Sequence, residues 1–185
     1  ANVGSLTYHF GSKAALLREI YQRHTEPMNN RRMELLGEAR RIHDPEERLM
    51  AILRAYVLPA FSSSSGFDGG GVEFTRMRAV LSAEGNEDAR TIIAGAFDVT
   101  SRAFLDAIAD CLPGADREGL VWRSHFLLGA LYYALINPQR VTRLSDGAVD
   151  GNDRNTAVNQ IVEASFASFR SLDTSGREKR PDHAA

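Results

Sequence analysis

Histidine, cysteine and paired carboxylates are the side chains that catalysis and metal binding use most often, and this sequence does not group them. Its histidines lack the HExxH or His-x-x-x-His spacing that holds a metal ion, and no GxSxG turn presents a nucleophilic serine. The acidic segment 146–153 lacks the ligand spacing of a calcium-binding loop, so we interpret it as solvated surface. The residues therefore predict a protein that is not an enzyme and that has no cofactor and no metal. The scattered histidines are His9, His24, His43, His125 and His183.

The most informative residues lie between Gly4 and Lys13, where the sequence reads Gly-Ser-Leu-Thr-Tyr-His-Phe-Gly-Ser-Lys. The part from Tyr8 to Lys13, with the leucines that follow it, resembles the recognition-helix segment of the tetracycline-repressor-like (TetR) family of transcriptional regulators. In that family a short helix ends in Tyr-His-Phe, a Gly-Ser-Lys turn follows, and a leucine-bearing helix begins. The resemblance implies a ligand-responsive homodimer, usually a repressor, that binds a palindromic operator in double-stranded DNA.

The chemistry of this segment agrees with the resemblance. A short helix that starts at Ser5 would present Leu6 and Thr7 to base edges, where either can contact a thymine methyl group. Tyr8 and His9 suit phosphate oxygens. Lys13 falls in the first turn of the next helix, where its charge and free backbone amides form a phosphate site. The alternative is that this segment forms a helix, a turn and a capped helix that make no DNA contacts. The predicted DNA-binding residues are Ser5, Leu6, Thr7, Tyr8, His9 and Lys13.

The segment departs from the family pattern in two ways. Two fewer residues separate Val3 from Phe10 than family members usually have, and the first helix and most of the second are missing from a complete helix-turn-helix. We therefore expect that these 185 residues are part of a longer protein, and that DNA binding needs its upstream part.

Charge and composition favour a globular DNA-binding protein, although the net charge of −2 by itself does not. Residues 1–43 contain seven basic and four acidic side chains, whereas the rest of the chain contains 15 and 20. Such a gradient also fits an ordinary solvated helix surface. The single cysteine, Cys111, forms no internal disulfide, and the longest apolar run, 126–136, is shorter than a membrane span. These features predict a cytoplasmic protein that does not associate with membranes.

Apolar spacing of three and four residues predicts an all-α protein. Asp44 and Pro45 are expected to begin one helix, Asp116 another and Asp153 the last, while Pro27 is expected to end or bend the first. The segment 120–136 is apolar on nearly every side, so we expect other helices to surround it. The expected helices cover 12–42, 44–61, 74–81, 86–112, 116–136 and 153–172, and the segments 62–71 and 142–152 are expected loops.

These patterns divide the chain into three parts. By the family resemblance, residues 1–24 are expected to form the C-terminal part of a helix-turn-helix DNA-binding domain and the start of the connecting helix. Residues 25–173 are expected to form a helical-bundle domain for ligand binding and dimerisation, and residues 174–185 a disordered tail.

Aromatic residues in the body predict a largely apolar pocket that accepts an apolar or amphiphilic effector. The similarity of the segment 126–131 to family members that respond to lipid-like molecules favours an acyl chain. An apolar stripe on the last helix predicts the homodimer interface, which the central helix would share. The candidate ligand-binding residues are Tyr56, Phe74, Phe97, Arg102, Phe104, Trp122, His125 and Phe126. The candidate interface residues are Val158, Ile161, Val162, Phe166 and Phe169.

Two other functions remain open from the sequence. A helical protein-interaction module could use the basic N-terminal segment to bind a protein partner, and DNA binding would separate it from a regulator. A small all-α enzyme is the third possibility, which turnover of a substrate would support.

Overall fold

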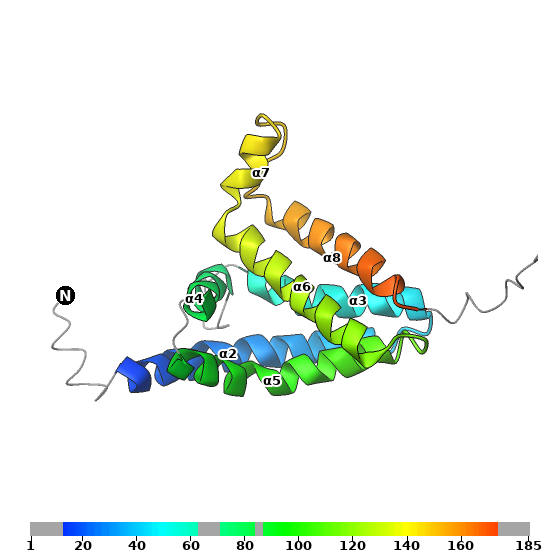
Figure 1. Ribbon diagram of the computed structural model, residues 1–185, viewed down its shortest axis with the longest axis horizontal. Helices are drawn as coiled ribbons and strands as arrows, with labels where there is room; N and C mark the ends of the chain where they lie inside the picture. The colour runs from blue at the N-terminus through cyan, green and yellow to red at the C-terminus, as the bar shows by residue number, and fades with distance from the viewer. Residues whose placement is uncertain (1–12, 63–70, 84–86, 174–185) are drawn as a thin grey trace, which may run out of the picture.

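The chain folds as a bundle of α-helices, and no strand occurs among the residues that the structure describes. The computed structural model describes residues 13–62, 71–83 and 87–173 (Figure 1). This architecture confirms the all-α prediction. The elements are α2 (Lys13–Ala39), α3 (Pro45–Val57), the 3-10 helix η1 (Leu58–Phe61), α4 (Gly71–Ala83), α5 (Glu87–Ala109), α6 (Arg117–Ile136), α7 (Gln139–Leu144) and α8 (Arg154–Arg170).

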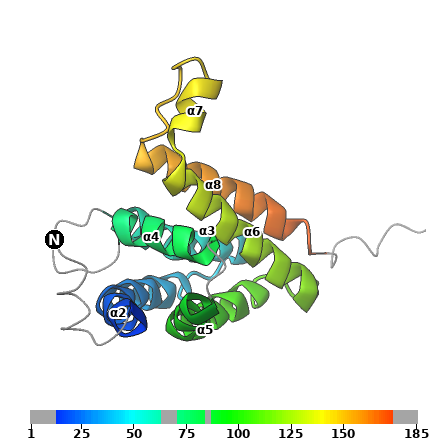
Figure 2. The ribbon, with the colours of Figure 1, turned by 60° about the vertical axis from the view of Figure 1, so that its left-hand side comes forward.

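Helix α2 is a continuous 27-residue helix that contains Pro27. Proline lacks the amide that would bond to the preceding turn, but α2 is not interrupted there. Its expected end near Ile42 lies three residues too far, because Arg40 and Arg41 already form a turn. Helix α2 lies beside α5 at the base of the molecule and also packs on α3 (Figures 1 and 2).

Aspartate caps begin three of the helices, as the sequence predicts. Asp44 accepts a hydrogen bond from the backbone amide of Glu47 at 2.8 Å, with Pro45 in the first turn of α3. Asp116 accepts from the amide of Gly119 at 2.7 Å at the start of α6. Each carboxylate satisfies an amide that has no partner inside its helix, so the cap selects where the helix starts.

Some helix boundaries differ from the expected ones. The expected helix 44–61 ends as α3 at Val57 and continues only as η1, which contains Pro59. Part of the segment 142–152, expected as a loop, belongs to α7, and Gly151 packs so closely on the Pro138 carbonyl that a side chain there would collide with it. Most of the expected loop 62–71 and the tail from residue 174 lie outside the described residues.

The main core lies where α3, α6 and α8 meet, with contributions from α2 and α5. A smaller cluster of Met28, Phe74 and Phe97 joins α2, α4 and α5. Leu36, Ile52, Leu53, Leu131 and Phe169 are completely buried in the main core.

Helix α6 is covered by the rest of the chain on one face only, which corrects the expectation that other helices surround it. Its buried residues Leu120, Leu127, Leu131 and Leu135 belong to the main core, and the helices that pack on α6 are α4, α5 and α8. Its opposite face exposes large apolar side chains, so burial within one chain explains only part of the apolar character of α6. These exposed residues are Val121, Trp122, Phe126, Tyr133 and Ile136, and we call them the outer face of α6.

None of the helices in the described part of the chain is long and apolar enough to cross a membrane.

The cap of α8 leads to a prediction on pH dependence. The side chain and the amide of Thr156, together with the amide of Asn155, bond to Asp153 and lower the pKa of its carboxyl group below 3.8. A folded pKa below the unfolded one adds stability at neutral pH, and this contribution is lost as the pH falls below 3.8. We expect Asp153→Ala to lower the thermal midpoint at pH 7, and Asp153→Asn to lower it less, because the amide oxygen still accepts backbone hydrogen bonds but has no charge. In thermal unfolding followed by circular dichroism, the gap between wild type and Asp153→Ala should narrow in acid. A constant gap would contradict the assigned ionic cap.

Candidate functional site

The predicted DNA-binding residues lie at the edge of what the structure describes. Ser5, Leu6, Thr7, Tyr8 and His9 fall outside the described residues. Lys13 is the first residue of α2, and its position there agrees with the expected first helical turn after the Gly-Ser motif. DNA contact by these residues therefore remains a prediction.

Four of the candidate ligand-binding residues lie in the interior, in two aromatic groups. Phe74 and Phe97 stack with ring centroids 6.4 Å apart and join α4 to α5. Tyr56 meets Phe104 edge to face at 5.2 Å and joins α3 to α5. Phe74, Phe97 and Phe104 are buried, and Tyr56 is half-buried.

The other four candidates lie on the surface. Trp122 and Phe126 are 51% and 53% exposed on the outer face of α6, with ring centroids 5.7 Å apart. His125 is exposed beside Trp122, and Arg102 is exposed on α5. These side chains point away from the interior, so they do not line a pocket inside the bundle.

The apolar stripe on α8 is turned inward. Val158, Ile161, Val162 and Phe169 are buried in the core of their own chain, and Phe166 is half-buried against it. In this arrangement α3 and α6 cover the stripe, so Val158, Ile161, Val162 and Phe169 are not available to a second copy.

Two buried arginines, absent from the sequence-based candidates, are the most unusual feature of the interior. Arg32 on α2 is 1% exposed, and Arg78 on α4 is 2% exposed. Lysine and arginine are almost never fully buried unless a counter-charge or a ligand accompanies them. Together with Tyr56 and Tyr132 they form what we call the arginine–tyrosine cluster, which joins α2, α3, α4 and α6.

Arg32 contacts Tyr56 in two ways. Its Nε donates to the Tyr56 backbone carbonyl at 2.9 Å, and its guanidinium carbon lies 4.2 Å from the centre of the Tyr56 ring. Its Nη2 is buried without a hydrogen-bond partner among the described residues. One end of the guanidinium group is therefore held in place, while the other has an unused donor.

Arg78 lies between two aromatic rings. Its guanidinium carbon is 3.9 Å from the centre of the Phe97 ring and 5.0 Å from that of Tyr132. Within the described part of the chain, its Nε is buried without a hydrogen-bond partner. Stacking on ring faces stabilises a cation but leaves its in-plane N–H donors free.

The electrostatics of the cluster follow from burial. Burial, and to a smaller extent the positive charge of Arg78, lowers the pKa of Arg32 to about 10, while the two tyrosines act in the opposite direction. Burial also raises the pKa of Tyr132. At neutral pH Arg32 is therefore charged and Tyr132 is neutral, and the cluster contains two arginines and no carboxylate.

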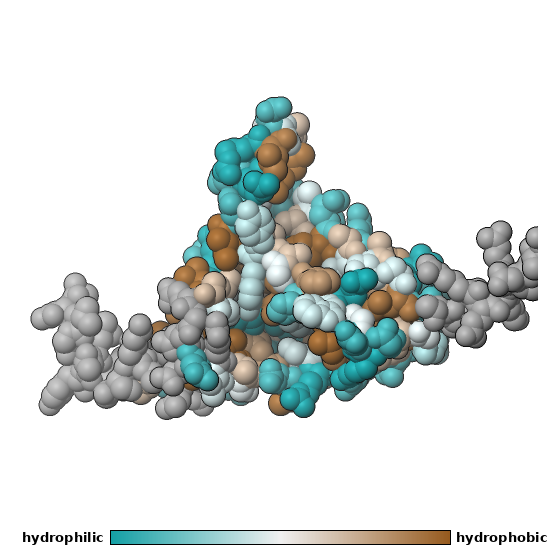
Figure 3. Space-filling model, viewed as in Figure 1, coloured by the Kyte–Doolittle hydropathy of each residue, from teal (hydrophilic) through white to brown (hydrophobic). Residues whose placement is uncertain are grey.

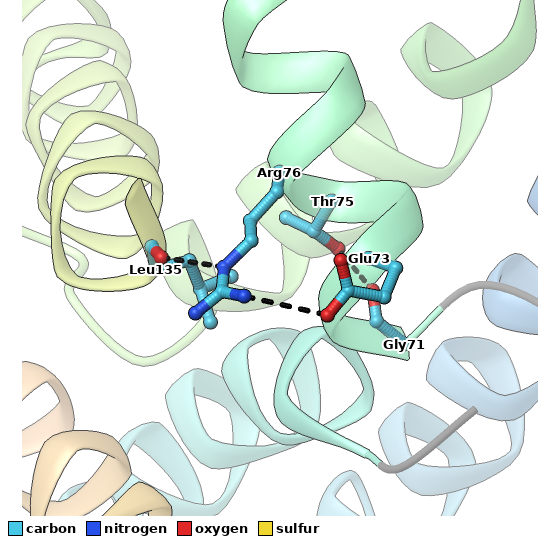
Figure 4. Close-up of polar contacts among 5 residues, drawn as sticks. All are labelled: Gly71, Glu73, Thr75, Arg76 and Leu135. Atoms are coloured by element: carbon cyan, nitrogen blue, oxygen red, sulfur yellow. Dashed lines mark hydrogen bonds and ion pairs between the residues drawn. The ribbon is translucent and has the colours of Figure 1, made fainter. Parts of the chain in front are cut away.

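Arg76 holds α4, which carries Arg78, against α6. Figure 4 shows its Nε donating to the Leu135 carbonyl at 2.7 Å and its Nη1 paired with Glu73 at 3.3 Å. The Leu135 carbonyl lies in the last turn of α6, where no helical amide can reach it. Thr75 donates to the Gly71 carbonyl in the first turn of α4. These contacts fix the position from which Arg78 enters the cluster.

The helical spacing of the sequence indicates that Arg32 is buried. Met28, Arg32 and Leu36 follow each other at intervals of four, so they share one face of α2. A charged residue between two buried apolar ones on that face must itself be buried. The same spacing relates Arg78 to Phe74.

A separate open cleft of about 570 Å³ lies between α2, η1 and the start of α8. Arg31, Glu34 and Arg154 are among its lining residues, and Arg31 and Glu34 form an exposed ion pair at 3.0 Å. Its polar rim makes it a weaker candidate for an apolar ligand than the aromatic interior. Among the described residues no group of three or more His, Cys, Asp or Glu side chains could hold a metal ion.

The fold and this interior define a helical-bundle protein with a buried polar and aromatic centre. A family model for the tetracyclin repressor-like C-terminal domain matches residues 54–167. The chain therefore belongs to the tetracycline-repressor-like family, as the segment from Tyr8 to Lys13 predicts. No curated protein sequence matches the chain.

Proposed function

We propose that this protein is a ligand-responsive, DNA-binding transcriptional regulator that acts as a homodimer in the cytoplasm, with repression as its mode of action. Membership of the tetracycline-repressor-like family is the observation that carries the proposal. The segment from Ser5 to Lys13 supports DNA binding, because its hydroxyl, aromatic and basic side chains suit base edges and phosphates. A two-fold dimer would place its recognition helices in major grooves about 34 Å apart on a palindromic operator.

The homodimer is best built on the outer face of α6. Trp122, Phe126, Tyr133 and Ile136 recur at intervals of three, four and seven residues and share one side of the helix. In Figure 3, hydrophobic (brown) and intermediate (pale) residues lie over the middle of the molecule, where α6 crosses the same view in Figure 1. The neighbouring α8 exposes the small residues Ala164 and Ala167. Two copies of α6 and α8 would then make a four-helix interface.

Helix α2 provides a route between ligand and DNA. It begins at Lys13, directly after the proposed DNA-binding segment, and Arg32 joins it to the buried cluster. A ligand that moves the cluster would move α2 and change the distance between the two recognition helices of the dimer. A coupling of about 1–3 kcal/mol would change operator affinity about 5- to 150-fold.

DNA binding through the N-terminal segment is testable with one substitution. We expect Lys13→Ala, made in the gene's full-length product, to weaken binding to all duplexes and lower the salt slope by about one, since one phosphate contact is lost. Fluorescence anisotropy with duplex DNA at several salt concentrations measures both effects. Arg41→Ala is the matched control, because Arg41 is exposed beyond the far end of α2. Unchanged affinity and slope in Lys13→Ala would refute the assignment.

The same measurement separates the two other candidate functions. A protein-interaction module would show no affinity for duplex DNA beyond weak background binding. Substrate turnover by the purified protein would support an enzyme instead.

A further inference from the structure

The buried arginines Arg32 and Arg78 have no counter-ion among the residues that the structure describes. The ion pairs in that part of the chain use other arginines, namely Arg31, Arg76, Arg117 and Arg170, all of them at least 40% exposed. Among the described residues, the ionisable groups that shift the pKa of Arg32 are Tyr56, Tyr132 and Arg78, and none of them is a carboxylate. The interior thus holds two like charges close enough to repel each other.

The contacts that these arginines make do not balance that charge. Aromatic faces, one backbone carbonyl and the Tyr132 hydroxyl group contact the guanidinium groups, and these are neutral partners. Burying a charge with neutral partners alone is unfavourable, so an anion at this position would be strongly favoured. Among the described residues, Arg32 Nη2 and Arg78 Nε are buried donors without a hydrogen-bond partner, as are Thr25 Oγ1 and Arg123 Nε.

The unused donors and their surroundings indicate the class of the anion. The free N–H donors of Arg32 Nη2 and Arg78 Nε suit the oxygens of a carboxylate, and charge-assisted hydrogen bonds of this kind are short and strong. The adjacent cluster of Met28, Phe74 and Phe97, with the half-buried Ile92 and Ile93, is apolar. A molecule bound here would place a carboxylate against the arginines and a hydrocarbon body against this cluster.

We propose that Arg32 and Arg78 together bind the carboxylate of a small amphiphilic acid, the body of which packs against Met28, Phe74 and Phe97. This inference rests on the proposed function, because it names the chemical class of the effector. It adds a charge requirement to the apolar or amphiphilic effector expected from the sequence. Neutral apolar molecules of the same shape are expected to bind more weakly.

Thermal unfolding in a series of straight-chain carboxylates from acetate to decanoate tests the proposal without DNA. At constant ionic strength against chloride, we expect the midpoint to rise with carboxylate concentration and more steeply with chain length, because a ligand of the folded state stabilises it. The matched primary amides should have a much smaller effect. No rise with any carboxylate would overturn the proposal, as would equal rises with acids and amides. A phosphate monoester that stabilises more than the acid of equal chain length would overturn the choice of a carboxylate.

The variant Arg78→Met separates this site from other binding modes. It keeps the length of the side chain and removes the charge, so we expect affinity for octanoate in calorimetry to fall about ten-fold or more. Without ligand it should unfold at the same temperature as wild type or higher, because an uncompensated buried charge is removed. Arg102→Met, an exposed arginine on α5, is the matched control and should bind octanoate as wild type does.

Undiminished octanoate affinity in Arg78→Met would overturn the proposal, and so would a large loss of ligand-free stability, which would mean that Arg78 is a structural residue. Arg32→Met provides a second test of affinity.

Carboxylate binding that depends on Arg78 in a protein without affinity for DNA would refute the proposed function and leave the proposed anion site unaffected. DNA binding without carboxylate binding would do the reverse.

Discussion

Replacing Trp122 and Phe126 together by glutamate is expected to convert the proposed homodimer into a folded monomer. Both rings are more than half exposed in a single chain, and they lie beside each other on the outer face of α6. In a dimer built on this face they would be buried, and two buried carboxylates without partners would raise the dissociation constant about 100-fold or more. Sedimentation velocity at micromolar concentration measures the change, and circular dichroism verifies that the helices remain.

Val99→Glu is the control for this experiment. Val99 is an apolar residue on α5 that is 80% exposed, so a charge there should leave both the fold and the dimer intact. If the Trp122 and Phe126 double variant sediments as wild type does, the interface does not lie on the outer face of α6. A variant that loses its helices would contradict the exposure of these two rings.

Phe169→Ala is expected to produce the largest loss of stability of any substitution considered for this protein. The ring is completely buried in the main core, where α8 packs on α3 and α6. Removing a buried phenyl group loses its transfer free energy and leaves a cavity, which together cost about 3–5 kcal/mol. Urea denaturation followed by circular dichroism measures the loss.

Phe166→Ala provides the comparison one turn earlier on α8. Phe166 is half-buried, and the Arg170 guanidinium lies 5.5 Å from the centre of its ring, so a smaller loss is expected. The denaturation midpoint of Phe169→Ala also shows whether Phe169 is a core residue or an interface residue. If Phe169→Ala instead changed only the dissociation constant of the dimer, Phe169 would be an interface residue, as the sequence pattern indicates.

Apolar periodicity identified helices, but it does not show whether an apolar face packs within its own chain or on a partner. The α8 stripe from Val158 to Phe169 and the α6 segment from Leu120 to Ile136 are both apolar in sequence. In the folded chain the α8 stripe is buried, whereas α6 has one buried and one exposed face. A side chain that packs within its own chain and one that packs on a partner satisfy the same hydrophobic effect, so their patterns are alike.

The candidate ligand site shows the same division. Phe74, Phe97 and Phe104 were predictable, because large aromatic residues on the inner faces of helices are buried in most helical proteins. Trp122 and Phe126 are equally aromatic, but the rotation of α6 places them outside. Arg32 and Arg78 were not predicted, since a charged residue is normally expected at the surface.

The sequence by itself determined most of the helices, several of their ends and the family. Apolar spacing defines helices because their residues share a face every three or four positions, and Asp44, Asp116 and Asp153 mark starts because each caps a free amide. Only the tertiary structure decided which faces are covered and which distant side chains meet. Arg32 and Arg78 are 46 positions apart, and their approach depends on how α2 and α4 pack on α5 and α6. No local pattern encodes such a contact, because it depends on the packing of the whole bundle.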